Sequence, residues 1–112
     1  MKIDIETKAP VIKLLNDCVF DAFGITIDDL RKKDKTRYVS LCRIAYTNVA
    51  YINAKILTVI ELGLLTNRTH SNVSWQLKKH NQLMKTNYDY IELYTRLNNK
   101  LNQLKTKENG MV

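Results

Sequence analysis

The sequence has few residues that break helices, with one proline and three glycines among 112 residues. An antiparallel sheet would need turns more often than such residues occur here. Hydrophobic residues make up 45% of the chain, which is enough for one compact core, and the pattern shows no second module. The composition therefore predicts a single all-α domain.

Long apolar runs are also absent, and none approaches the ~20 residues that a membrane-spanning helix needs. The first residues, M-K-I-D-I-E-T-K, alternate in charge and lack the apolar stretch of a signal peptide. We therefore expect a cytoplasmic protein, associated with the nucleoid if it binds DNA, and no membrane partner.

Cysteine is scarce, and the two present do not form a metal site. Cys18 and Cys42 each fall in a helical apolar pattern, and neither has a His or Cys at the spacing of zinc ligands. We expect both to be reduced core residues, and we expect no metal and no cofactor. No carboxylate pair, Ser-His-Asp set, thiolate–His pair or glycine-rich phosphate loop emerges, so we expect no enzymatic activity and no small-molecule substrate.

Acidic residues are few in the middle of the chain. Residues 31–85 contain eleven basic and two acidic residues, a net charge of +9, whereas the rest contains seven basic and nine acidic residues, a net charge of −2. A basic patch of this kind is expected where a protein binds a phosphate backbone. A solvated surface that keeps a protein in solution would have the same composition, so charge alone leaves both interpretations open.

Helical periodicity predicts the N-terminal elements. Residues 1–8 are expected to be a flexible lead-in. Pro10 suits the first turn of a helix that Gly24 ends in a left-handed conformation, and Thr26 caps a short helix after it. The apolar face of the first helix consists of Val11, Leu14, Leu15, Cys18, Val19 and Ala22.

A central helix and a last helix follow from the same reasoning. The central helix, over residues 36–51, has an apolar stripe that leaves Arg43 and Asn48 facing outward. Asn87 caps the last helix, whose apolar face must pack on the preceding helices or on a second copy of the chain. Residues 105–112 are expected to be a flexible tail, so the domain of five or six helices spans residues 9–104. The apolar face of the last helix consists of Tyr90, Leu93, Tyr94, Leu97, Leu101 and Leu104.

The pattern of apolar and capping residues over 58–85 predicts two helices joined by a tight turn. Thr58 caps the first helix, in which Gly63 lets the two helices approach closely, and Thr69 or Ser71 caps the second. The second helix has a buried stripe of Val73, Leu77, His80 and Met84. This arrangement is typical of a helix-turn-helix, in which the start of the second helix reaches base edges in the major groove.

The expected partner is double-stranded DNA. The exposed start of the second helix supplies the candidate base-reading residues, and its amide, hydroxyl and imidazole groups suit base edges or phosphates. An Asn such as Asn72 can pair with adenine in two hydrogen bonds. The candidate base readers are Arg68, Thr69, His70, Ser71 and Asn72, and the candidates for the DNA backbone or minor groove are Arg31, Lys32, Lys33, Lys35, Arg37, Arg43, Lys55, Thr58, Lys78 and Lys79.

Several other residues have an ordinary structural interpretation. We expect His70 to contact DNA rather than a metal, and His80 to lie in the core or at its boundary. Trp75 is expected to pack under the last helix. Tyr88, Tyr90 and Tyr94 are expected in the core or at a helix interface, and Glu61 in a salt bridge or a helix cap.

Three segments carry a family resemblance. They are F-G-I-T-I-D-D-L at residues 23–30, V-S-L-C-R-I-A at 39–45 and E-L-G-L-L-T-N-R-T-H-S-N-V at 61–73. In order and rough spacing, residues 11–104 resemble the C-terminal DNA-binding domain of the bacterial replication initiator DnaA, which is a helix-turn-helix domain of the Trp-repressor-like class. The resemblance implies that Thr69, His70 and Ser71 read bases, and that the protein regulates transcription or replication in a bacterium, phage or mobile element.

The chain departs from that family at informative positions. Thr69 stands where the family has an Asp, and Asn72 where it has a Thr, so the preferred DNA sequence should differ. Cys42 aligns with the family Arg that enters the minor groove, so that contact would have to come from the basic segment 31–37. No G-x-x-x-x-G-K-[ST] motif occurs, so the ATPase region of an initiator is missing.

A competing hypothesis is a helical protein–protein interaction module that keeps this fold without binding DNA. It would bind a homodimer partner or another protein through the tyrosine and leucine face of the last helix.

Overall fold

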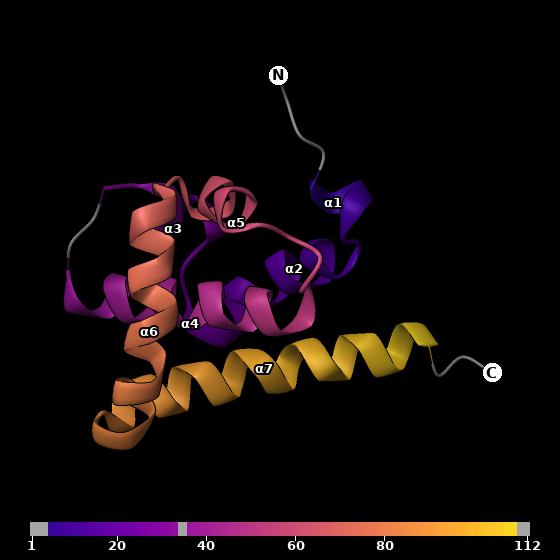
Figure 1. Cartoon of the computed structure of the whole chain (residues 1–112). Coiled ribbons are helices and arrows are strands. Elements are labelled where there is room, and N and C mark those ends of the chain that lie inside the picture. The colour runs from indigo at the N-terminus through magenta and orange to yellow at the C-terminus, as the bar shows by residue number, and fades with distance from the viewer. Residues whose placement is uncertain (1–4, 34–35, 110–112) are drawn as a thin grey trace.

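The structure is a computed structural model that describes residues 5–33 and 36–109. Within these ranges the chain is all-α, as the composition predicts, with seven helices and no strand (Figure 1). None of the helices in the described part is long and apolar enough to cross a membrane. The helices are α1 (Ile5–Lys8), α2 (Val11–Phe23), α3 (Ile27–Arg31), α4 (Arg37–Asn53), α5 (Val59–Thr66), α6 (His70–Thr86) and α7 (Tyr88–Asn109).

Local signals set the ends of α2 and α3. Gly24 ends α2 in a left-handed conformation with φ of 75°, and its N–H donates to the carbonyl of Phe20 at 2.8 Å. Thr26 caps α3 through a reciprocal box in which the Asp29 side chain accepts from the Thr26 N–H. Both predicted caps are confirmed.

The described residues nearest both ends of the chain are helical, where the pattern predicts flexible segments. Residues 5–8 form α1 instead of part of a flexible lead-in, because Ile5 is buried in the core and Lys8 pairs with Glu61 of α5. At the other end α7 continues to Asn109, where we expected a tail from residue 105. Lys105 donates from Nζ to Asn53 Oδ1 at 3.1 Å, which ties this extension to α4. The remaining parts of both predicted segments, residues 1–4 and 110–112, lie outside the described residues.

The central helix α4 packs against α2, α3, α5, α6 and α7, and this corrects one prediction. All residues from 41 to 50 are buried, so Arg43 and Asn48 do not face outward and are only 6% and 4% exposed. A helix covered on all sides has no outward face, and its polar groups must find partners inside. Asn48 donates from Nδ2 to the carbonyls of Ile44 and Gln76 at 2.9 and 3.1 Å.

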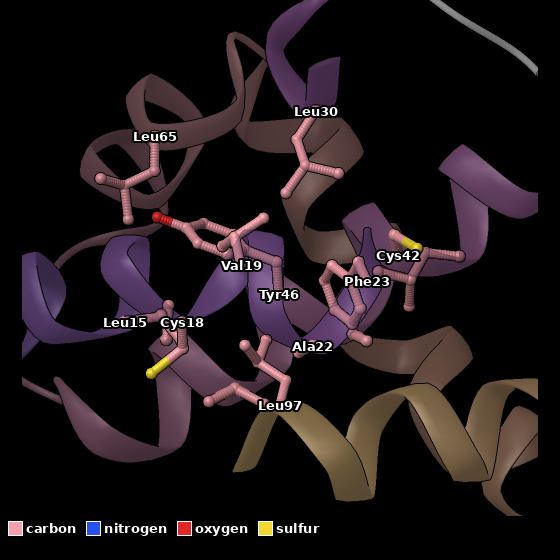
Figure 2. Close-up of a cluster of buried hydrophobic side chains, with 14 of the residues drawn as sticks. Leu15, Cys18, Val19, Ala22, Phe23, Leu30, Cys42, Tyr46, Leu65 and Leu97 are labelled. Carbon is pink, nitrogen blue, oxygen red and sulfur yellow. The ribbon is translucent and has the colours of Figure 1, made fainter. Parts of the chain in front are cut away.

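The apolar face of α7 packs within the chain. Tyr90, Leu93, Leu97 and Leu101 are buried, and α7 lies along α2 and α4 (Figure 1). Figure 2 shows Leu97 pointing into the cluster formed by α2 and its neighbours. Of the two packing alternatives for this face, the structure therefore has the preceding helices.

Cys18 and Cys42 are free and buried, as the pattern predicts (Figure 2). Burial raises the pKa of the Cys18 thiol to about 11 and that of the Cys42 thiol to about 12. Neither thiol is therefore appreciably ionised near neutral pH, and both act as small apolar residues.

Candidate nucleic-acid interface

Helices α5 and α6 are joined by the three residues 67–69. Thr58 caps α5 through a box with Glu61, and Asn67 ends it in the left-handed region with φ of 55°. Thr69 caps α6, because its Oγ1 accepts from the Asn72 N–H at 3.2 Å. Of the two cap alternatives at the start of α6, the structure uses Thr69.

Gly63 permits the close approach of this turn to α5. A Cβ at Gly63 would lie 2.2 Å from the carbonyl oxygen of Arg68 and 3.5 Å from Cγ2 of Val73. The Arg68 N–H also donates to the Gly63 carbonyl at 2.8 Å. The nearest neighbour is thus the turn itself, with α6 next to it, and glycine is required for this packing.

The first turn of α6 is exposed at Thr69, His70, Ser71 and Asn72. From Ser71 an outward stripe continues along the helix at intervals of three or four residues, while Val73, Gln76 and Leu83 are buried on the other side. The stripe consists of Ser71, Trp75, Lys78, Gln82 and Lys85. Four of the five candidate base readers therefore share an accessible surface at one end of α6.

Trp75 corrects another prediction, because it does not pack under the last helix. It is 53% exposed and lies on the outward stripe of α6. Its position four residues after Ser71 is the sequence signal that could have placed it there. The tyrosines are divided, with Tyr90 buried, Tyr94 half-buried and Tyr88 88% exposed, so Tyr88 is also outside the core.

Arg68 does not point toward solvent at the start of α6. Its guanidinium donates to the carbonyls of Thr66 and Asn67, each at 3.0 Å, and to the carbonyl of Lys32 at 2.7 Å. The side chain therefore holds the turn against the segment that follows α3.

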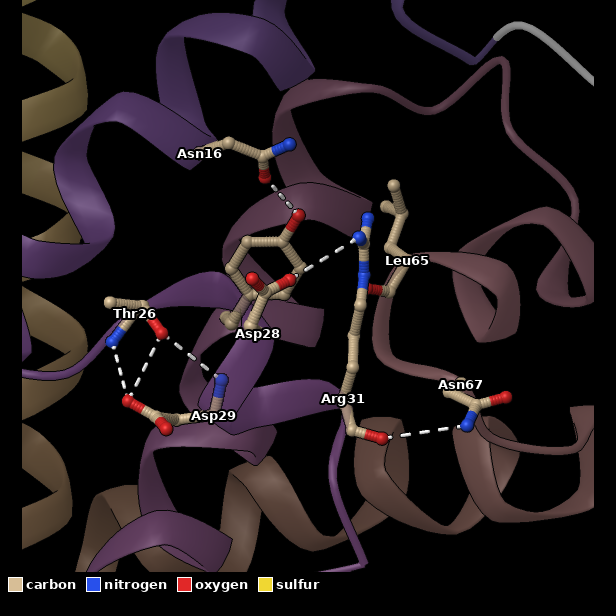
Figure 3. Close-up of polar contacts among 8 residues, drawn as sticks. Asn16, Thr26, Asp28, Asp29, Arg31, Leu65 and Asn67 are labelled. Atoms are coloured by element: carbon tan, nitrogen blue, oxygen red, sulfur yellow. Dashed lines mark hydrogen bonds and ion pairs between the residues drawn. The ribbon is translucent and has the colours of Figure 1, made fainter.

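Arg31 and Arg43 also bind carbonyls at helix ends. Arg31 donates from Nε to Leu65 O at 2.9 Å and has Asp28 at 3.9 Å (Figure 3). Arg43 donates from Nε to Leu30 O at 2.8 Å. Cations suit the negative C-terminal ends of helices, here those of α3 and α5.

An open hollow of about 480 Å³ lies beside the start of α6. Among the described residues that line it, three are cationic, namely Lys33, Arg43 and Arg68, and none is acidic. Trp75 and Ile44 supply apolar wall, and two readers, Thr69 and Asn72, lie at its edge. The remaining lining residues are Ser40, Asn67 and Gln76. Sequence reasoning selected neither Ser40 nor Gln76, because neither residue has a charge or a motif that marks it.

The other candidate backbone contacts are dispersed. Arg37 lines a different groove, of about 410 Å³, together with Asp89 and Glu92 of α7. Lys55 follows the opposite end of α4, and the Thr58 side chain is engaged in its cap. Lys32 pairs with Asp29 at 3.5 Å.

Two lysines extend the basic surface along α6. Lys78 is exposed on the outward stripe, and Lys79 is half-buried and donates to Gln82 Oε1 at 3.0 Å. Lys35 lies outside the described residues.

His80 and Glu61 have structural environments. His80 Nδ1 lies 2.7 Å from the Tyr90 hydroxyl, and partial burial lowers the pKa of the imidazole. Glu61 accepts from Lys8 Nζ at 2.8 Å and from the Thr58 N–H at 2.9 Å, so it acts both as a salt bridge and as a cap. Among the residues that the structure describes, no group of three or more His, Cys, Asp or Glu side chains could hold a metal ion.

Comparisons with known proteins place this chain in no family. No family model, no curated protein and no solved structure matches it.

Proposed function

We propose that this protein is a sequence-specific binder of double-stranded DNA, in which α5 and α6 act as a helix-turn-helix and the start of α6 enters the major groove. The observation that carries the proposal is the exposed first turn of α6 beside a hollow whose described lining residues include three cationic ones and no acidic one. Base-edge readers next to a cationic surface are the arrangement that DNA recognition by a helix requires.

Within this proposal fewer residues read bases than the sequence predicted. Thr69, His70, Ser71 and Asn72 are the base readers, whereas Arg68 shapes the turn that presents them. Lys33 and Lys78 are the clearest phosphate contacts, because both are exposed and lie next to this surface. The resemblance of residues 11–104 to the DnaA C-terminal domain supports a role in regulating transcription or replication, at the nucleoid of a bacterium or on phage DNA.

The salt dependence of binding tests the proposal. Affinity for a mixed-sequence duplex should fall steeply with salt, in a linear plot of log K against log salt concentration, because neutralised phosphates release counterions. Lys33→Ala should weaken all sequences alike and reduce the salt slope by about one. Lys13→Ala, which removes an exposed lysine of α2, is the matched control and should change neither quantity. Absence of measurable binding at about 50 mM salt would refute the proposal.

Specificity is tested separately from affinity. His70→Ala should reduce discrimination among duplexes selected from a random pool, since one good base contact is worth about 1–3 kcal/mol. If His70→Ala left the sequence preference intact, the assignment of the reading residues would be wrong.

The competing hypothesis of a protein–protein interaction module depended on an exposed apolar face of α7. The tyrosine and leucine face of α7 is largely buried within the chain, at Tyr90, Leu93, Leu97 and Leu101. Such a module would have to use other exposed apolar side chains, such as Ile56, Ile60 and Leu64 at four-residue intervals. This difference makes DNA binding the better supported function.

A further inference from the structure

Gln76 is a buried polar residue beneath the proposed reading surface. Its side chain is 1% exposed, and its Nε2 donates to Asn72 Oδ1 at 2.7 Å, one turn earlier on α6. Asn72 is itself exposed and lies with Gln76 at the edge of the hollow. The contact therefore links a buried group directly to one of the candidate base readers.

The stability of the core does not explain this glutamine. Its Oε1 is buried and has no hydrogen-bond partner among the described residues. A buried polar group that is only partly satisfied is less favourable than an apolar side chain of similar size. Unsatisfied groups of this kind in folded proteins call for another explanation, and a functional role is one of them.

The hydrogen bond fixes which way the Asn72 amide faces. Oδ1 points back to Gln76, and Nδ2 is the end that remains fully available. The Asn72 backbone N–H is held at the same time by Thr69 Oγ1 at 3.2 Å, so both the backbone and the side chain of this residue are oriented. Asn72 therefore has both N–H donors of Nδ2 available, whereas one of the two lone pairs of Oδ1 is already used.

We infer that Gln76 is a positioning residue that sets the base preference of Asn72. This inference rests on the proposed DNA-binding function and refines it. In the major groove guanine offers two adjacent acceptors, O6 and N7, whereas cytosine offers only the N4 donor. Adenine needs an acceptor for its N6 amino group, and one of the two lone pairs of Asn72 Oδ1 already accepts from Gln76, so adenine meets a partly used acceptor. The base opposite Asn72 is therefore guanine in preference to adenine, and cytosine is disfavoured most.

The test begins by locating the base pair that Asn72 contacts. Duplexes selected from a random pool by the wild-type protein are compared with those selected by Asn72→Ala, and the position whose preference disappears is the one that Asn72 reads. Wild-type protein should prefer guanine over cytosine there by about fivefold or more, which is the effect of one good contact. Preference for adenine or cytosine at that position, or no position that changes, would overturn the inference while leaving DNA binding intact.

Two substitutions of Gln76 then test whether it sets the base preference of Asn72. Gln76→Met removes the donor with little change in volume, so the amide of Asn72 can turn and the guanine preference should fall to nearly equal binding. Gln76→Glu in its ionised form offers only acceptors, so Asn72 should donate to it, expose Oδ1 and shift the preference toward cytosine or adenine. Because burial raises the pKa of a carboxyl, this variant is measured at about pH 8. Gln76→Met should not alter the salt slope, because it removes no phosphate contact and changes no charge.

Gln76→Met is also informative about stability. Because it removes an unsatisfied buried oxygen, its thermal midpoint should equal or exceed that of wild type, whereas a purely structural glutamine would lower it. In the Asn72→Ala background Gln76→Met should have no further effect on base preference. An unchanged guanine preference in Gln76→Met would overturn the inference, and a wild-type protein that binds no duplex would overturn the proposed function with it.

Discussion

Three arginines in this chain donate to backbone carbonyls, and Arg31 also pairs with Asp28 at 3.9 Å. Arg31, Arg43 and Arg68 donate to carbonyls near the ends of α3 and α5, and these carbonyls have no further partner along their own helices. Guanidinium has five donors in a planar arrangement, so one side chain can join several carbonyls from different segments. The start of α6 is therefore positioned by a network centred on the segment that follows α3.

Arg43 provides the test at this scale. Replacing it with Met should destabilise the protein by about 1–3 kcal/mol, because the buried Leu30 carbonyl loses its donor while the apolar part of the side chain is kept. Urea unfolding measures the change. Arg37→Met at an exposed position of the same helix is the matched control and should change the free energy of unfolding by less than about 0.5 kcal/mol. Equal effects of the two substitutions would show that Arg43 is not held as described.

At the scale of elements, the α5–α6 pair depends on a glycine that is not at a turn. Gly63→Ala should destabilise the protein by about 1–3 kcal/mol, although alanine favours a helix by about 1 kcal/mol, because its Cβ would overlap the Arg68 carbonyl oxygen. Gly24→Ala is the comparison, since no atom lies within 4 Å of its Cβ and only the strain of positive φ, roughly 1 kcal/mol, applies. Urea unfolding of both variants gives the ranking. A Gly63→Ala protein as stable as wild type would contradict the described packing.

The caps of α3 and α5 make stability depend on pH. Hydrogen bonds from the Lys8 side chain, and then from the Thr58 backbone N–H, hold the pKa of Glu61 below its ordinary value of 4.5. The pKa of Asp29 is lowered by the Thr26 backbone N–H. Since both values are lower in the folded state, their stabilisation is fully present above the unfolded-state values and is lost as pH falls through the folded ones.

The free energy of unfolding should therefore decrease as the pH falls below about 4.5, and Glu61→Gln should make that decrease shallower. Urea unfolding between about pH 7 and pH 3 measures the slope. Asp17→Asn, at an exposed carboxylate of α2, is the control and should leave the slope unchanged. If Glu61→Gln retained the full acid sensitivity, the Lys8–Glu61 contact between α1 and α5 would not be stabilising the fold.

The sequence predicted those features that depend on neighbouring residues only. Gly24, Thr26 and Thr58 act at their own helix ends, and their signals lie within four residues. The environments of Arg43 and Arg68 depend on segments far away in the chain, because α4 is covered by five helices and the Lys32 carbonyl is 36 residues from Arg68. Local periodicity contains no information about such coverage, so it assigned both side chains to the surface.

The same distinction applies to the candidate site. The exposed turn from Thr69 to Asn72 follows from the cap and the helical period, and it could be predicted. The hollow beside it is formed by α4, α6, the turn between α5 and α6 and the segment before α4, so its lining residues Ser40 and Gln76 could be found only once these segments were packed together.

At the scale of the whole molecule, the fluorescence of the single tryptophan can show whether DNA binds to the α6 face. Trp75 is half-exposed and lies on the outward stripe of α6, next to Asn72 and the cationic hollow. Tyr88 is the most exposed aromatic residue in the described ranges and lies at the start of α7, beyond the far end of α6. Indole fluorescence therefore distinguishes DNA on the proposed face from DNA bound elsewhere, without a label.

Duplex binding should protect Trp75 from quenching by a neutral quencher such as acrylamide, because a helix in the major groove places its outward stripe against DNA. Protection should disappear as salt is raised, in parallel with affinity measured by mobility shift. Tyr88→Phe is the control, since it alters an exposed aromatic away from this face and should leave both signals as in wild type. Binding that is evident by mobility shift but leaves Trp75 fully open to the quencher would place the DNA on another face. The basic surface would then act through its charge, and the first turn of α6 would not be the reading edge.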